Sequence, residues 1–257
     1  MAQNIYDDPA FFAAYSQFRR SRDGLDGAAE WPALRGMLPA MGGHDVVDLG
    51  CGFGWFCRWA IGAGARSVLG VDLSANMLER ARVETADPAV RYAQADLDSL
   101  ELPEAAFDLA YSSLAFHYVA DFARLARSVR RALRPGGQLV FSIEHPIYMA
   151  PSRPDWATLP DGRKVWPLDS YLREGPRTTH WLVPGVVKHH RTLGTTLNVL
   201  IEAGFAIRRV EEWKPSAEQL ASLPEAAQEL DRPMFLLIAA QAEFGTARVL
   251  AQRPRVR

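Results

Sequence analysis

The stretch Val46-Val47-Asp48-Leu49-Gly50-Cys51-Gly52-Phe53-Gly54 decides the fold. Its first four residues are mostly apolar and predict a short buried strand, and glycines then follow at every second position. Glycine has no Cβ, so the backbone can turn sharply here and let a ligand come close. A helix is predicted from Phe53 to about Gly62. A strand, a glycine turn and a helix in this order are typical of the opening of a nucleotide-binding βαβ unit.

The next predicted strand, Ser67–Asp72, ends in a carboxylate that is well placed to bind the two hydroxyls of a ribose. Two details disfavour a nicotinamide dinucleotide. The glycine spacing differs from G-x-G-x-x-G, and Asp48 stands two residues before the first glycine, where it would repel a pyrophosphate. A carboxylate there suits a ligand with an amino group and a positive centre. S-adenosylmethionine (SAM) is such a ligand, with a sulfonium, an amino-acid end, a ribose and no phosphate.

Two motifs in order, at the spacing of one βαβ unit, carry a family resemblance. The glycine stretch resembles motif I of the class I SAM-dependent methyltransferases, and Val71-Asp72-Leu73-Ser74-x-x-Met77-Leu78 resembles their motif II. Further similarity lies in Gln94–Leu97, Phe107–Ser112 and Leu133–Leu139. The resemblance covers roughly residues 40–145 and is strongest for the small-molecule type related to the menaquinone and ubiquinone biosynthesis methyltransferases, with a methyltransferase type 11 domain.

The alternation of apolar strands and amphipathic helices implies an α/β fold with helices on both faces of a parallel sheet. The resemblance sharpens this into a Rossmann-like, seven-stranded, mostly parallel sheet whose last strand is antiparallel. The expected parts are an N-terminal helical lid (1–44), the SAM-binding core (45–145), an insertion that caps the acceptor pocket (146–190), the rest of the core (191–242) and a mobile tail (243–257).

The insertion after the fifth strand is rich in proline and aromatic residues, which excludes long helices. A hairpin is predicted, with Tyr171–Leu182 paired to Val186–Arg191 across Pro184-Gly185. An aromatic segment at the carboxyl edge of the sheet would form a wall of the acceptor pocket. The alternative is a surface flap or a dimer contact.

The resemblance also implies roles for individual residues. The glycine turn with Asp48 would cradle the amino-acid end of SAM, Asp72 would bind the ribose, Leu73, Asp96 and Leu97 would hold adenine, and Ser112 would line the methyl side. In the lid, Tyr6, Tyr15 and Arg19 would reach the active site or the cofactor carboxylate. The expected cofactor-binding residues are Tyr15, Asp48, Gly50, Cys51, Gly52, Gly54, Asp72, Leu73, Met77, Asp96, Leu97 and Ser112.

Three histidines are candidates for a general base, because histidine titrates near neutral pH. His117 follows the fourth predicted strand, His145 follows the fifth, and His190 ends the hairpin. We expect His145 to be the catalytic residue, followed by His117 and His190. Each has a structural alternative: His117 can shape the pocket, His145 can anchor the loop before Pro146, and His190 can be a solvated strand residue.

Composition narrows the function further. The 257 residues are 48% hydrophobic and carry a formal net charge of −1, which is ordinary for a soluble globular protein and offers no basic field for nucleic acid or membrane. Two cysteines and no signal peptide indicate a reducing, cytoplasmic setting. No residue cluster has metal-ligand spacing, so no metal is expected.

The sequence therefore predicts an enzyme that transfers a methyl group from SAM to a small-molecule acceptor, as a monomer or homodimer. A SAM-binding regulator or partner subunit without turnover is the alternative, and an NAD-dependent oxidoreductase is disfavoured by Asp48 and the glycine spacing.

Overall fold

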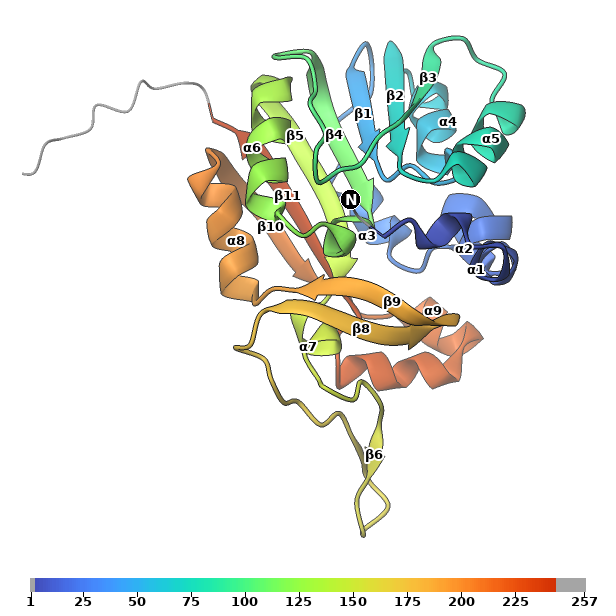
Figure 1. Cartoon of the computed structure of the whole chain (residues 1–257), viewed down its shortest axis with the longest axis vertical. Helices are drawn as coiled ribbons and strands as arrows, with labels where there is room; N and C mark the ends of the chain where they lie inside the picture. Colours follow the sequence, from blue (N-terminus) through green and yellow to red (C-terminus); the bar gives the residue numbers. More distant parts are fainter. Residues whose placement is uncertain (1–2, 244–257) are drawn as a thin grey trace, which may run out of the picture.

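A computed structural model describes residues 3–243, so the predicted tail lies outside the described residues from position 244 onward. The core is a seven-stranded sheet with the order β10-β11-β5-β4-β1-β2-β3 (Figure 1). The strands are β1 (Asp45–Leu49), β2 (Ser67–Asp72), β3 (Val90–Gln94), β4 (Phe107–Ser113), β5 (Leu133–Glu144), β10 (Phe205–Glu212) and β11 (Phe235–Ala242). Strands β1 to β5 are parallel, whereas β11 is antiparallel to both of its neighbours. The predicted Rossmann-like sheet with an antiparallel last strand is confirmed.

Helices cover both faces of this sheet. The helices beside the strands are α4 (Trp55–Gly62), α5 (Ala75–Glu84), α6 (Phe122–Ala132) and α8 (Leu193–Glu202). Helices α6 and α8 pack on the face that carries Val47 and Leu49, and α4 and α5 pack on the face that carries Val46. Successive residues of a strand point to opposite faces. Asp48 therefore points toward α4, together with Val46.

Side-chain caps fix where several helices begin. Ser74 accepts the backbone N–H of Met77 at the start of α5, Asp121 accepts that of Arg124 at α6, and Thr192 accepts that of Thr195 at α8. Each cap binds a backbone donor that the first helical turn leaves without a partner.

Local backbone geometry sets the boundaries of two further elements. Helix α6 ends at Ala132, and Pro135-Gly136-Gly137 lies within β5, where the pairing with β4 jumps from Phe107–Leu133 to Leu109–Gln138. Gly136 has a φ of +81°, so the segment forms a bulge. Residues 217–230 form two short elements divided at Pro224, α9 (Ala217–Ser222) and a 3-10 helix, η4 (Pro224–Leu230).

The N-terminal segment runs across the carboxyl edge of the sheet (Figure 1). It consists of five short elements: η1 (Ile5–Asp7), α1 (Pro9–Tyr15), α2 (Arg19–Arg22), η2 (Gly24–Gly27) and α3 (Trp31–Arg35). The Asp7 carboxylate accepts hydrogen bonds from the Ser74 hydroxyl and from the backbone N–H of Ala75 and Asn76. This carboxylate at the helix N-terminus holds η1 on α5.

After β5 the chain leaves the sheet and returns as a hairpin. The segment holds α7 (Pro146–Met149), β6 (Ala157–Thr158), β7 (Lys164–Val165), β8 (Gly175–Trp181) and β9 (Val183–His190). The predicted hairpin exists, but its turn was misplaced: Trp181 pairs with Val183 and His180 with Pro184. The chain reverses at Leu182, which has a φ of +64°.

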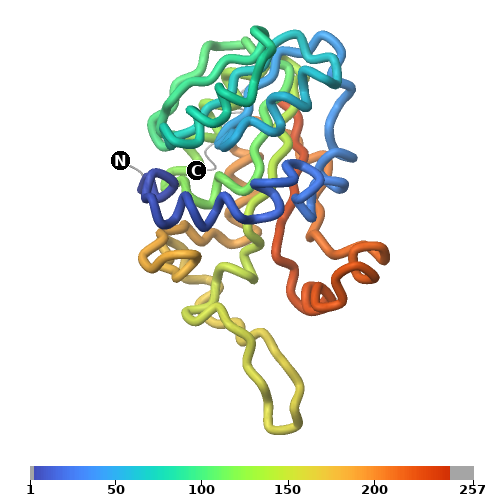
Figure 2. Tube along the Cα trace, turned by 90° about the vertical axis from the view of Figure 1, so that its right-hand side faces the viewer, coloured from blue at the N-terminus to red at the C-terminus, as the bar shows by residue number. Residues whose placement is uncertain are grey.

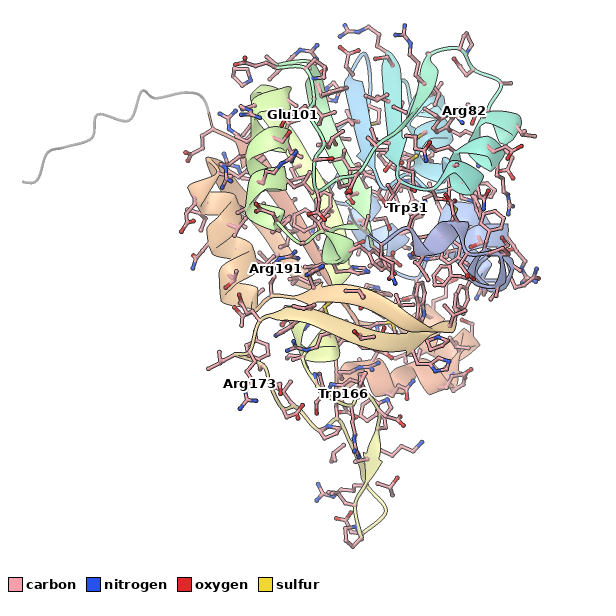
Figure 3. All side chains as sticks on the ribbon, in the orientation of Figure 1. Trp31, Arg82, Glu101, Trp166, Arg173 and Arg191 are labelled. Atoms are coloured by element: carbon pink, nitrogen blue, oxygen red, sulfur yellow. The ribbon has the colours of Figure 1, made fainter. Side chains whose placement is uncertain are left out.

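The arm that carries β6 and β7 projects from the body in both views (Figures 1 and 2). Where the arm joins the body, the indole of Trp166 donates a hydrogen bond to the carbonyl oxygen of Ile147 (Figure 3). Within residues 3–243, no helix is long and apolar enough to cross a membrane.

Replacing Gly50 tests how tightly the glycine turn is packed. Gly50 has a φ of +79°, and an added Cβ would lie 2.3 Å from the Cβ of Ala115. Gly50→Ala should lower the free energy of unfolding by about 2–5 kcal/mol, measured by denaturant titration. Gly52→Ala is the control, because its Cβ meets nothing within 4 Å, and it should cost only about 1–2 kcal/mol. Equal costs for the two variants would contradict this packing.

Candidate functional site

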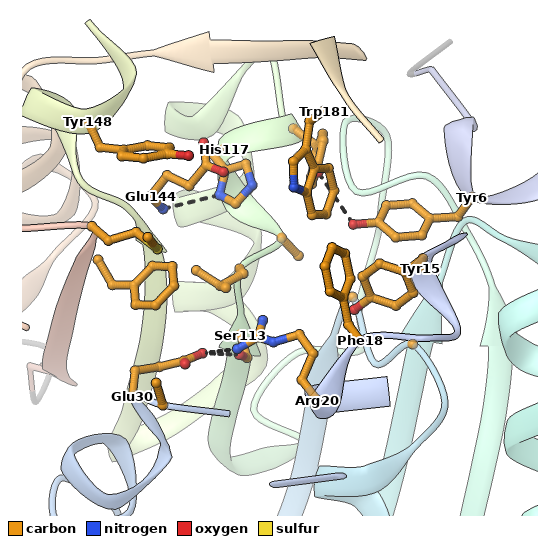
Figure 4. A pocket seen from close by; sticks show the side chains of 18 of the residues that line it. Tyr6, Tyr15, Phe18, Arg20, Glu30, Ser113, His117, Glu144, Tyr148 and Trp181 are labelled. Carbon is orange, nitrogen blue, oxygen red and sulfur yellow. Dashed lines mark hydrogen bonds and ion pairs between the residues drawn. The ribbon is translucent and has the colours of Figure 1, made fainter. Parts of the chain in front are cut away.

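A cavity of about 610 Å³ opens at the carboxyl edge of the sheet (Figure 4). It is bordered by the ends of β1, β2, β4 and β5, by the N-terminal segment, by the tip of the hairpin and by η4. The predicted cofactor-binding residues that line it are Tyr15, Gly50, Gly52, Asp72, Leu73, Met77, Asp96 and Leu97. Residues that are distant in the sequence thus meet in one cavity, as the parallel sheet requires.

Asp72 joins the glycine turn to the end of β2. Its Oδ2 accepts the backbone N–H of Gly52 at 2.8 Å, and its Oδ1 accepts that of Ser74 at 2.9 Å. Burial raises the pKa of this carboxyl, although the two N–H groups oppose the shift. Beside it, the space in front of Gly52 contains no atom within 4 Å of an added Cβ. The turn therefore presents open backbone and a carboxylate to the cavity, which is what a ribose-bearing ligand needs.

Four predicted cofactor residues do not line the cavity: Asp48, Cys51, Gly54 and Ser112. Asp48 is buried behind the turn, where the Cys57 thiol donates to its Oδ2 at 3.3 Å, and burial raises its pKa to about 7. The Ser112 hydroxyl donates to the carbonyl oxygen of Leu49 at 2.7 Å. These residues support the turn from behind, and their contact with SAM stays a prediction.

An aromatic wall lines one side of the cavity (Figure 4). It is made by Tyr6, Tyr15, Phe18 and Trp181. The rings of Tyr6 and Tyr15 meet edge to face at 5.1 Å between centroids, and those of Phe18 and Trp181 stack at 6.1 Å. Trp181 comes from the hairpin tip, and the other rings come from the N-terminal segment. The two parts of the chain outside the core thus meet beside the cavity.

A buried ion pair that the sequence did not predict stands at another side of the cavity. The guanidinium of Arg20 pairs with the carboxylate of Glu30, and Glu30 Oε1 also accepts the hydroxyl of Ser113 at 3.4 Å. Glu30 is buried, and its Oε2 has no hydrogen-bond partner among the described residues. The sequence pointed to Arg19, whose exposed side chain pairs with Asp23. Helix α2 has four residues and so no periodicity that could separate the two arginines.

Among the three candidate histidines, His117 lines the cavity. It is buried, and its Nδ1 accepts the backbone N–H of Glu144 at 3.3 Å. Burial, followed by the charges of Lys188 and Arg191, lowers the pKa of His117 well below its usual value. The ring is therefore neutral, and its proton lies on Nε2.

His145 and His190 are buried but do not line the cavity. The Nδ1 of His145 accepts the N–H of Ile147 at the start of α7, and its Nε2 lies 2.9 Å from Glu212 Oε1. The Nε2 of His190 donates to the carbonyl oxygen of Tyr171 at 2.8 Å. His145 thus has the anchoring role that the sequence left open as its alternative.

The end of β5 brings a second unpredicted ion pair to the site. Glu144 lines the cavity next to His117 and binds the ammonium of Lys188 at 2.5 Å. Lys188 is buried on β9, and its ammonium lies 4.7 Å from the ring centre of Trp181. Sequence reasoning considered Glu144 but had no signal for Lys188, since a lysine on a predicted surface hairpin is normally exposed. Residues 3–243 contain no group of three or more potential metal-ligating side chains.

This sheet order, with a glycine turn and strand-end carboxylates on one cavity, defines a Rossmann-like protein of the methyltransferase fold. Comparison with known proteins agrees. Residues 47–141 match the family model of the methyltransferase domain. A SAM-dependent methyltransferase from Mesorhizobium loti is 65% identical, with a TM-score of 0.83 over 85% of this chain and all of that one. A putative SAM-dependent methyltransferase from Listeria monocytogenes is 43% identical, with a TM-score of 0.80 over 86% of this chain and all of that one.

The chain belongs to the SAM-dependent methyltransferases, and the predicted cofactor and enzyme class are confirmed. An uncharacterized protein of Haemophilus influenzae is 33% identical over 93% of this chain and 96% of its own length. A malonyl-[acyl-carrier protein] O-methyltransferase of Pectobacterium atrosepticum is 39% identical over 109 residues, which are 42% of each chain.

The variant Asp48→Asn tests whether Asp48 supports the glycine turn or contacts the cofactor. Burial raises the pKa of Asp48 to about 7, whereas the unfolded chain loses this proton at a pKa of about 4. The carboxylate therefore lowers the free energy of unfolding by its full amount above pH 7, and this effect disappears below pH 4. The variant should raise the free energy of unfolding at pH 8 by about 1–3 kcal/mol, and the gain should shrink as the pH falls toward 4. Unchanged stability with weaker binding of S-adenosylhomocysteine would instead place the charge of Asp48 in the cofactor site.

His117 should make the fold sensitive to acid. Below the unfolded pKa of about 6.5 the unfolded chain binds a proton at His117 that the folded protein does not, so stability falls as the pH falls. His117→Gln should reduce the slope of unfolding free energy against pH, between pH 6 and 5, by up to about 1.4 kcal/mol per pH unit. The exposed His180 provides the control variant His180→Gln, which should leave the slope unchanged. Identical slopes for all three proteins would refute a neutral buried His117.

Proposed function

We propose that this chain transfers the methyl group of SAM to a small-molecule acceptor bound in the same cavity. One observation carries the proposal. The glycine turn and Asp72 border the same enclosed space as the aromatic wall, His117 and Glu144, which belong to no cofactor motif. A protein that only bound the cofactor would not need this additional space. The intact turn and the polar groups beyond it favour turnover over a purely regulatory role.

The residues at the turn fit SAM. Asp72 would accept the ribose hydroxyls, and Asp96 and Leu97 would hold the adenine. The buried pair of Arg20 and Glu30 suits the amino-acid end, because a guanidinium binds a carboxylate and the unpartnered Glu30 Oε2 can accept an ammonium. SAM carries no phosphate, so the Asp72 carboxylate beside the glycine turn would not repel it.

SAM supplies a methyl group that its sulfonium already makes electrophilic. The chain's own contribution is to hold the acceptor in line and to exclude water, and good orientation is worth up to about 7–11 kcal/mol. The N-terminal segment is fixed over the site by Asp7 at α5 and by Gln3, whose side chain bonds Gly185 and Val187 of the hairpin. We infer that this segment and Trp181 close the cavity as a lid.

We infer that His117 positions the acceptor. Its Nδ1 is occupied by the N–H of Glu144, so Nε2 carries the proton and can donate to an acceptor oxygen or nitrogen lone pair. His145 and His190 have no such access, since they do not line the cavity. We therefore move the leading histidine role from His145 to His117.

The O-methylation of malonyl-[acyl-carrier protein] is a property of relatives that share less than half of their length with this chain. These relatives therefore do not identify the acceptor of this chain, because the segment that they share with it is short. We propose a cytoplasmic setting, which suits the two free, buried cysteines, Cys51 and Cys57. We also propose a monomer or homodimer.

Titration calorimetry with S-adenosylhomocysteine and with NADH tests the cofactor site. The protein should bind S-adenosylhomocysteine with micromolar affinity and NADH weakly. Asp72→Asn should weaken the binding of S-adenosylhomocysteine about 10- to 100-fold, because a charged acceptor of the ribose is lost. Glu79→Gln, on the exposed face of α5, is the control and should bind like the unmodified chain. Tighter binding of NADH, or no effect of Asp72→Asn, would overturn the proposed cofactor site.

A further inference from the structure

Part of the cavity lies beyond the glycine turn and carries a charge pattern of its own. This acceptor lobe is lined by Tyr148, Trp213, Leu223, Glu229, Met234 and Phe235. It is built from α7, from the chain after β10, from η4 and from the start of β11. None of these residues belongs to a cofactor motif. The lobe is mostly apolar and aromatic, with a few polar groups, as is typical of a site for a small organic molecule.

Glu229 is the polar group of this lobe that needs a ligand. It is buried, at 5% exposure, and its Oε1 binds the guanidinium of Arg232 at 2.5 Å. Its Oε2 has no hydrogen-bond partner among the described residues. A buried carboxylate oxygen without a partner is unfavourable unless a bound molecule supplies a donor. Glu229 lines the lobe, so a hydrogen-bond donor bound there is the group that can satisfy this buried oxygen.

The cation of this pair does not face the cavity. Arg232 is not among the residues that line it, and its guanidinium lies over the rings of Tyr148, Trp166 and Trp156 at 4.5, 4.4 and 5.3 Å from their centres. These three rings and Glu229 surround the guanidinium. The pair thus turns its negative end toward the lobe and keeps its positive end behind it.

Glu144 repeats this arrangement. Its carboxylate lines the cavity on the same side as Tyr148 (Figure 4), whereas its partner Lys188 does not line the cavity. Arg20, which does line it, is already bound to Glu30. The Arg19 side chain is largely exposed and pairs with Asp23. Among the described residues that line the cavity, Arg20 is the one partly buried cation, and it is assigned to the amino-acid end of SAM. No other such cation is left for an anionic acceptor, whereas the carboxylates of Glu144 and Glu229 both border the cavity.

We propose that the methyl acceptor is an organic amine, recognised through its nitrogen by the carboxylate of Glu229 and with its apolar body against Met234, Phe235 and Trp213. This inference rests on the proposed methyl transfer. The amine binds as its ammonium form, which supplies the donor that Glu229 Oε2 lacks and is attracted by Glu144 and by the aromatic rings around it. For transfer, the ammonium gives one proton to the Glu229 carboxylate, and the nitrogen lone pair that this frees forms the bond to the methyl carbon. The carbon–sulfur bond of SAM breaks at the same time and leaves its electron pair on sulfur, which gives S-adenosylhomocysteine. A carboxylate or phosphate would meet the negative ends of both pairs and be repelled.

Calorimetry on the full chain saturated with S-adenosylhomocysteine tests this preference. The probes are phenethylamine, 2-phenylethanol and 3-phenylpropionate at pH 7.5, which share an aromatic body and differ in the charge of the end group. Phenethylamine should bind at least about tenfold more tightly than the other two. An acid or alcohol that binds as well as the amine, or an amine that does not bind up to about 10 mM, overturns the proposal.

Variants assign the preference to Glu229. Glu229→Gln should weaken phenethylamine at least about tenfold and leave 2-phenylethanol and S-adenosylhomocysteine unchanged. Because this variant leaves Arg232 without its anion, the double variant Glu229→Gln/Arg232→Met removes both charges and should also lose the preference for the amine. Glu218→Gln, exposed on α9, is the matched control. Amine binding that persists in both Glu229 variants overturns the assignment.

The two proposals fail in different ways. If S-adenosylhomocysteine does not bind, the proposed function itself is wrong. If it binds and the amine is not preferred, the methyl transfer stands and the acceptor belongs to another class.

Discussion

The hydrogen bonds from Gly52 and Ser74 to the Asp72 carboxylate are the constraint on which the site depends. They join the glycine turn after β1 to the start of α5 after β2. Gly50 and Cys51 add their N–H groups to the carbonyl oxygen of Val71, so two neighbouring strands end in one rigid edge. Asp7 then docks the N-terminal segment on the same α5. The Asp72 carboxylate thus holds the glycine turn beside α5, and the Asp7 carboxylate holds the N-terminal segment on the same helix.

Buried ion pairs organise the rest of the cavity. Glu30, Glu144 and Glu229 each line it, and each binds one cation from a different part of the chain. Such pairs add little net stability, because desolvation offsets their attraction, but they cannot be rearranged without leaving a charge unpaired. Their orientation therefore decides the polarity of the cavity. Lys188 and Arg232 point their charge away from it, and the glutamates remain on its surface.

The positions of the histidines show where local reasoning stops. His117, His145 and His190 all follow strands and are all buried. They differ in their partners: a backbone N–H of Glu144 for His117, the start of α7 for His145 and a loop carbonyl for His190. Sequence position alone could not separate them, because each stands at or just after the end of a strand and packing decides which ring borders the cavity.

The sequence by itself determined the α/β fold class, the glycine turn and the carboxylates at the strand ends, because apolar periodicity and glycine geometry act over a few residues. Tertiary structure decided the rest. The ion pair of Lys188 with Glu144 and the stacking of Arg232 on Tyr148 and Trp166 depend on partners distant along the chain. The bulge at Gly136 depends on pairing with β4, and the reversal at Leu182 on a left-handed backbone conformation that a non-glycine residue rarely adopts. Whether a charged side chain faces solvent, a cavity or a buried partner is set by packing, which no short stretch of sequence specifies.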